Sequence, residues 1–205
     1  MSTVVLFAIL AFVLQMRNSW EQRKRLLHLG HYLRNFEIEK LMESLTEGYL
    51  RALGEDDADR RMQIWNMLEQ TEQNLNDQFQ RFVDAFAQAD AQASRGSTLP
   101  LALPFALVFA PSATFDIRQL LKVHAQGIEA TLSNAEALSH RDKAFRLSAE
   151  LFLMQHSCHW FCKSKLVASA RMLSRHKNTV HPIAQRGAPT NPTGLCPFDA
   201  RLERG

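Results

Sequence analysis

Residues 139–174 read SHRDKAFRLSAELFLMQHSCHWFCKSKLVASARMLS and keep a helical pattern for longer than any other stretch of the chain. Ser139, with Asp142 three residues later, has the form of a capping box and predicts the start of a helix. No Gly or Pro follows until Pro182, and most interior residues favour helix. A helix with this many apolar residues needs neighbours that cover it, so the stretch predicts an all-α bundle.

At 100° per residue, this helix separates a broad, mostly apolar face from a narrow polar seam behind it. We expect other helices to cover the broad face. That face carries Ala144, Ser148, Leu151, Phe152, Gln155, Cys158, His159, Cys162, Leu166, Ser169 and Leu173. The seam carries Arg146, Glu150, Ser157, Ser164 and Arg171.

The composition is that of an ordinary globular protein. With 205 residues, 46% of them hydrophobic and 22% charged, the chain is long enough for one domain and too apolar for wholesale disorder. A net charge of +3, from 24 basic and 21 acidic residues, is too small to predict a nucleic-acid partner. Three cysteines do not make a disulfide framework, which favours a reducing compartment.

An apolar run near the N-terminus predicts a membrane anchor within residues 1–20. Residues 4–16 read VVLFAILAFVLQM and, with the two residues before them, give about 22 Å of helix at 1.5 Å per residue. The hydrocarbon core of a bilayer is about 30 Å thick, so Arg17 and Trp20 would extend the helix into the headgroup region. The predicted anchor residues are Val4, Leu6, Phe7, Ile9, Leu10, Phe12, Val13 and Leu14.

Two other interpretations of the apolar run compete with a retained anchor. A cleaved signal peptide fits poorly, because no basic residue precedes the run and no small-x-small cleavage site follows it. The run could instead be the first core helix of a soluble bundle.

The charges next to the run predict its orientation. Arg17, Arg23, Lys24 and Arg25 lie just after it, and positive residues favour the cytoplasmic side of a membrane. We therefore expect a single-pass protein with its N-terminus outside and a cytoplasmic C-terminal domain. The basic cluster fits a solvated helix face and fits contact with anionic lipid headgroups equally well.

A helical hairpin is predicted to follow the anchor. Residues 20–53 carry two apolar stripes, the second shifted around the axis, and predict that the anchor runs straight into one long helix. Gly54 and the acidic residues 55–57 predict a helix end and a new start. The next helix, about residues 57–93, repeats apolar side chains in 3–4 alternation, which is typical of coiled-coil-like packing against the first helix or another copy of the chain.

A Pro-rich connection, residues 94–115, separates this hairpin from the later helices. Its apolar run, residues 99–111, reads LPLALPFALVFAP and is too short and Pro-rich for a second membrane span. One interpretation is a connection across the bundle that buries Leu101, Phe105 and Phe109. The other is a hydrophobic segment that docks onto a partner or the membrane surface.

The remaining elements complete a bundle of about four helices over residues 21–175. A third helix is expected from Asp116, a fair N-cap, to Ser133, with His124 as a core or boundary residue. The tail, residues 176–205, has several Pro and Gly and no apolar periodicity, so we expect it to be extended or disordered.

One cluster has the residue types of a metal site. Cys158, His159 and Cys162 are spaced so that all three could point to one position beside a helix, and zinc is the metal that such ligands favour. With His176 and His181 the spacing approaches that of a C2H2 zinc finger. The cysteines of such a finger lie on a β-hairpin, however, whereas these lie in a helical pattern. Buried cysteines that behave as small apolar residues are the competing interpretation.

The sequence favours a non-enzymatic function. It contains no G-x-S-x-G, Walker A, G-x-G-x-x-G or H-E-x-x-H motif, and no small-molecule substrate is identified. Our leading hypothesis is a membrane-anchored scaffold or assembly subunit that binds a protein partner or another copy of itself through its helical surface. The alternative is a metal- or cofactor-binding helical protein centred on Cys158, His159 and Cys162.

Overall fold

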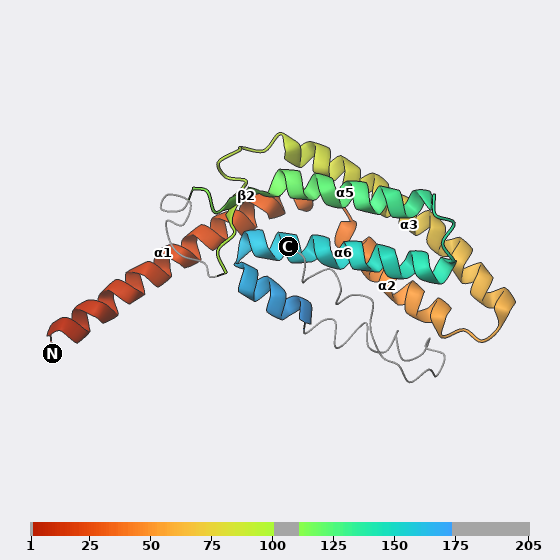
Figure 1. Cartoon of the computed structure of the whole chain (residues 1–205), viewed down its shortest axis with the longest axis horizontal. Coiled ribbons are helices and arrows are strands. Elements are labelled where there is room, and N and C mark those ends of the chain that lie inside the picture. Colours follow the sequence, from red (N-terminus) through yellow and green to blue (C-terminus); the bar gives the residue numbers. More distant parts are fainter. Residues whose placement is uncertain (1, 101–110, 174–205) are drawn as a thin grey trace.

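The computed structural model describes residues 2–100 and 111–173, which are mostly helical, as predicted (Figure 1). The predicted tail, residues 176–205, lies outside the described residues. So do residues 101–110, with the three apolar side chains expected to be buried there. The helices are α1 (Ser2–Leu33), α2 (Ile38–Leu53), α3 (Ala58–Ala87), α5 (Ile117–Ser133) and α6 (His140–Cys162), and residues 165–173 are also helical.

α1 runs without a break from the apolar run toward the other helices, but it ends at Leu33. The prediction of one long helix over residues 20–53 is therefore wrong, because the chain turns at residues 34–37. The Glu37 amide donates a hydrogen bond to Gln78 Oε1 at 2.8 Å and fixes this turn to α3. The turn explains the shift between the two apolar stripes, since each can now face the same core.

α2 and α3 pack against each other (Figure 1). Asp57 is the N-cap of α3, and its side chain accepts hydrogen bonds from two backbone amides in the first turn. α3 ends at Ala87, earlier than predicted. The Asp90 carboxylate accepts a hydrogen bond from the Ala93 amide at 2.7 Å, and such local side-chain bonds favour a turn over continued helix.

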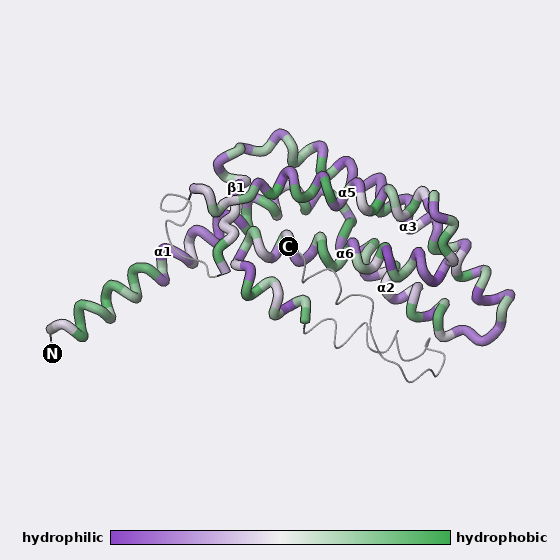
Figure 2. Tube along the Cα trace, in the orientation of Figure 1, coloured by the Kyte–Doolittle hydropathy of each residue, from purple (hydrophilic) through white to green (hydrophobic). Residues whose placement is uncertain are grey.

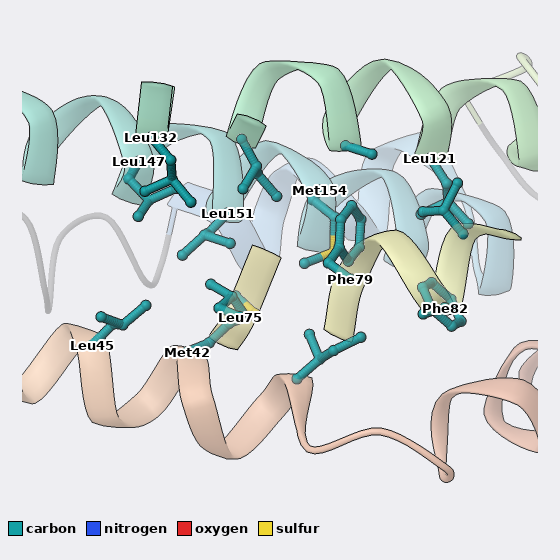
Figure 3. Close-up of a cluster of buried hydrophobic side chains, with 14 of the residues drawn as sticks. Met42, Leu45, Leu75, Phe79, Phe82, Leu121, Leu132, Leu147, Leu151 and Met154 are labelled. Carbon is teal, nitrogen blue, oxygen red and sulfur yellow. The ribbon is translucent and has the colours of Figure 1, made fainter. Parts of the chain in front are cut away.

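One apolar core joins α2, α3, α5 and α6, which we call the bundle (Figure 3). The 3–4 alternation of α3 places three phenylalanines, Phe79, Phe82 and Phe86, in this core, each 1% exposed, and α6 adds Phe161. The C-terminal part of α1 adds Leu29 to this core. Central core side chains include Met42, Leu45, Leu75, Phe79, Phe82, Leu121, Leu132, Leu147, Leu151 and Met154.

α6 begins at the predicted cap, where Ser139 Oγ accepts a hydrogen bond from the Asp142 amide at 3.2 Å. The predicted single helix is nevertheless wrong, because α6 ends at Cys162. Helical structure resumes at residues 165–173. The Oγ of the buried Ser164 accepts a hydrogen bond from the amide three residues later at 3.3 Å, so Ser164 caps a new helix.

The buried face of α6 is rotated from the predicted one. Ser157, which the sequence assigns to the polar seam, is 5% exposed, whereas Phe152 and Gln155 are only half-buried. Ser157 can be buried because hydrogen bonds to Leu153 and His124 satisfy its hydroxyl. The buried residues of α6 are Ala144, Leu147, Leu151, Met154, Ser157, Phe161 and Cys162.

Two short antiparallel strands, which the sequence does not predict, close the Pro-rich connection: β1 (Arg95–Ser97) and β2 (Thr114–Asp116). Gly96 pairs with Phe115, and a Cβ at Gly96 would lie 2.6 Å from the phenylalanine ring, so a larger residue does not fit there. Trp160 Nε1 donates a hydrogen bond to the Ser97 carbonyl at 2.9 Å. The two strands are thereby packed against the C-terminal end of α6.

Candidate functional site

The N-terminal half of α1 is an apolar helix that the other described residues, up to 100 and from 111 to 173, do not cover. The helix from Thr3 to Leu33 is long and apolar enough to cross a membrane, and none of its most apolar window is buried. Figure 2 shows this hydrophobic segment projecting away from the bundle. All the predicted anchor residues are exposed, by between 39% and 71%: Val4, Leu6, Phe7, Ile9, Leu10, Phe12, Val13 and Leu14.

Basic side chains follow the apolar segment on the same helix. Arg23 and Lys24 are exposed, and Lys24 Nζ lies 3.5 Å from the ring centroid of Trp20, a cation–π distance. Arg17 Nη2 lies 4.0 Å from Glu21 Oε1. Together they give α1 an apolar, then aromatic, then cationic order, which is the order of a helix that enters a membrane interface.

Arg25 differs from the other three basic residues because it is half-buried, whereas they are exposed. Burial raises the pKa of the Cys162 thiol to about 11, while the nearby charges of Arg25 and Lys163 act in the opposite direction. α1 also contacts α6, and Arg25 lies close enough to Cys162, the last residue of α6, for its charge to act on the thiol.

The cysteine cluster lies in an apolar setting. Cys158 Sγ lies 3.9 Å from Met154 Sδ, and burial raises the pKa of Cys158 to about 12, with a further contribution from Cys162. Metals bind the thiolate form of cysteine, so a metal ion at this position would have to displace both thiol protons. Within residues 2–100 and 111–173, no group of three or more His, Cys, Asp and Glu side chains is placed to hold a metal ion. His176 and His181 lie outside these ranges, so ligation by the Cys158, His159 and Cys162 cluster stays a prediction.

A buried ion pair joins three helices of the bundle. Glu72 of α3 is only 4% exposed, and its Oε2 lies 2.6 Å from Lys143 Nζ of α6. The Tyr49 hydroxyl of α2 donates a hydrogen bond to Glu72 Oε1 at 2.7 Å. Burial and the adjacent carboxylate raise the pKa of Tyr49, so it stays protonated and keeps donating. In the sequence, Glu72 lies on the otherwise apolar stripe of α3. A charged residue at such a position is the one feature of the sequence that indicates a buried polar network.

A second polar cluster lies between α5 and α6. His124 Nε2 lies 2.8 Å from Ser157 Oγ, and His124 Nδ1 lies 3.8 Å from Glu150 Oε2. The serine hydroxyl also donates its proton to the Leu153 carbonyl at 3.0 Å. Because that proton is used there, the hydrogen bond between the two side chains is assigned as His124 Nε2–H donating to Ser157 Oγ. Burial, and then the neighbouring His156, lower the pKa of His124, so its ring is neutral at pH 7.

Glu150, His124 and Ser157 carry the same three chemical groups as a catalytic triad, but their arrangement is different. Ser157 is 5% exposed and lies in the interior of α6, with its own proton directed at a backbone carbonyl. A nucleophilic serine must instead donate to the histidine and reach a substrate. The cluster therefore ties α5 to α6, in agreement with the prediction that His124 is a core residue.

Comparisons of the chain with protein-family models, with curated proteins and with solved structures found no match.

Proposed function

We propose that this protein is a membrane-anchored helical scaffold, with α1 in the bilayer and the bundle on the cytoplasmic side, where it holds a protein partner. The observation that carries the proposal is the uncovered apolar half of α1. Transferring a large apolar side chain out of water is favourable by about 1.5–3 kcal/mol, so eight such side chains give a strong driving force for insertion. The helix also satisfies its own backbone hydrogen bonds, as hydrocarbon requires.

The charges support the proposed orientation. Arg17, Arg23, Lys24 and Arg25 all lie on the C-terminal side of the apolar segment, and the bundle follows them. Positively charged residues near a single span favour the cytoplasmic side. Cys158 and Cys162 are free cysteines, which is compatible with a reducing cytoplasm.

The partner surface is proposed to lie on α3. Met67 is 72% exposed and Met62 is 48% exposed, although the bundle core is complete without them. Methionine is flexible and polarizable, and it is favoured at surfaces that adapt to a partner. Both residues lie in the N-terminal half of α3, the half that follows the turn from α2.

Two measurements on native membranes test the proposal. The full-length chain is expected to remain in the membrane pellet after carbonate washing, and its recovery in the soluble fraction would exclude the anchor. A photo-crosslinking amino acid at Met67 is expected to give one discrete, stoichiometric adduct. The same probe at Gln73, an exposed position on another face of α3, is the matched control. Equal crosslinking at both positions would exclude a partner surface at Met67.

A further inference from the structure

Two lysines far from α1 in the sequence lie at the end of the bundle where α1 leaves it. Lys163 follows α6 directly, and Lys165 begins the next helical stretch. α1 contacts α6 directly, and both helices also contact the β1 segment, since His28 Nε2 lies 3.4 Å from Ser94 Oγ and Trp160 Nε1 donates to the Ser97 carbonyl at 2.9 Å. These contacts place the turn after α6 close to α1. Figure 1 shows the end of α6 next to the part of α1 that enters the bundle. We call residues 163–167 the lysine turn.

The lysine turn lies close to the expected membrane surface. Arg25, its neighbour on α1, is nine residues beyond Met16, where the apolar run ends. At 1.5 Å per residue this is about 14 Å along the helix axis, less if the helix is tilted. This distance is no longer than the thickness of the headgroup region plus a Debye length of about 10 Å. Lysine side chains at this position therefore lie within the electrostatic field of anionic lipids.

The lysine turn combines cationic and apolar groups on one surface. Lys165 is exposed, and its Nζ lies 5.4 Å from the ring centroid of Trp160. Leu166 and Val167, directly after it, are 57% and 41% exposed. Lys163 is half-buried. Lysines beside exposed aliphatic side chains and an aromatic ring are typical of surfaces that lie in a membrane interface.

The opposite end of the bundle does not have this pattern. The turn between α2 and α3 carries four carboxylates within residues 55–59, next to Arg60 and Arg61. There the two signs of charge are mixed. At the anchored end, in contrast, the basic part of α1, residues 17–25, contains one acidic residue, Glu21, which pairs with Arg17.

We infer that the lysine turn docks onto anionic lipid headgroups of the same bilayer that holds α1. Lys163 and Lys165 thereby add a second contact to the one made by Arg17, Arg23 and Lys24, and the bundle lies against the membrane instead of moving freely on α1. This inference rests on the proposed function, because α1 must be inserted before the turn can reach headgroups. A basic residue near such a surface contributes about a fivefold change in the docking equilibrium, so the two lysines give about 25-fold.

The test measures how close the lysine turn lies to the lipid. The full chain, with a fluorescent amino acid at the exposed Ala170, is reconstituted into vesicles that carry an acceptor dye on some headgroups. We expect stronger energy transfer in vesicles with one-third phosphatidylserine than in pure phosphatidylcholine, and loss of that difference in about 0.5 M salt. Equal transfer in both lipids would overturn the inference, and is also the result expected if the lysines bind an acidic protein instead.

Charge variants identify the residues responsible. Lys163→Gln with Lys165→Gln is expected to reduce transfer in anionic vesicles to the value in neutral ones, and Lys165→Gln alone is expected to give an intermediate value. The control, Arg51→Gln with Arg60→Gln, removes the same charge from exposed positions at the opposite end and is expected to change nothing. Equal effects of the two double variants would overturn the assignment to the lysine turn.

The same samples separate this inference from the proposed function. Carbonate washing of the vesicles measures insertion of α1. Protein that stays in washed vesicles but shows lipid-independent transfer refutes the docking alone. Protein that is washed off refutes the anchor and the docking together.

Discussion

The N-terminal half of α1 and the interior of the bundle distribute polar and apolar groups in opposite ways. Phe7 in α1 is 71% exposed, whereas Glu72 in the bundle is 4% exposed. Both segments are regular helices, so helix formation does not explain the difference. The bundle can bury a carboxylate because Lys143 and Tyr49 satisfy it. Within the described residues, the apolar side chains of the N-terminal half of α1 have no such neighbours, and the proposed bilayer would supply the apolar surroundings that they lack.

The largest expected effect comes from breaking the buried ion pair. Glu72→Ala leaves the Lys143 ammonium buried without a counter-charge, which typically costs about 3–5 kcal/mol of unfolding free energy. Urea unfolding of the detergent-solubilised chain measures this loss. Glu69→Ala makes the same change at an exposed position on α3 and is expected to have little effect. Similar losses for both variants would show that the ion pair does not stabilise the bundle.

The converse change places a charge in the apolar half of α1. Leu10→Arg puts a guanidinium in the middle of the run, where insertion scales give a penalty of about 2.5–3.5 kcal/mol. The variant is expected to shift from the membrane pellet to the soluble fraction with its helical content retained. Leu27→Arg, at an exposed position beyond the run, is the control and is expected to stay in the pellet. Retention of both variants would contradict the anchor.

The polar cluster between α5 and α6 predicts a pH dependence. The folded-state pKa of His124 lies below the value of about 6.5 of an unfolded histidine. Below about pH 6.5 the unfolded state therefore binds more protons, and unfolding free energy falls as the pH falls. The Glu150 carboxylate, 3.8 Å away, and His156 are the titratable groups that face the ring.

Unfolding measured at pH 7.5 and at pH 5.5 checks this sign. His124→Gln is expected to reduce the loss of stability on acidification, whereas the exposed His31→Gln is expected to leave it unchanged. An acid-induced loss that is the same in both variants would exclude His124 as a source of the pH dependence.

The smallest expected effect concerns the cysteines of α6. On the packing interpretation, Cys158→Ala with Cys162→Ala removes two sulfur atoms and costs about 1 kcal/mol or less per site. On the ligation interpretation, removing the metal costs on the order of 10 kcal/mol. Thermal unfolding of wild type and the double variant, with and without a chelator, measures the difference. We expect a modest shift on mutation and none on chelation, and a chelator-induced collapse of wild type would establish a metal site.

Local signals in the sequence determined where several helices begin. Asp57, Asp116 and Ser139 each accept hydrogen bonds from first-turn amides, as their residue types and positions predict. A cap depends on neighbours within three or four residues, which the sequence contains in full. The sequence also determines that the α1 run is apolar on all sides and needs an apolar environment, but it leaves open whether a protein core or a membrane provides it.

Only the tertiary structure decided which polar groups are buried and where two helices break. Ser157 is buried because His124 lies opposite it on α5, and the turn at residues 34–37 is fixed by Gln78 of α3. The position of Lys163 and Lys165 beside α1 likewise depends on how α6 packs. In each case the contact that decides the outcome comes from a residue tens of positions away in the chain. The periodicity of a sequence predicts on which face of its own helix a side chain lies. It does not predict which residue of another helix will contact that side chain and satisfy its hydrogen bonds.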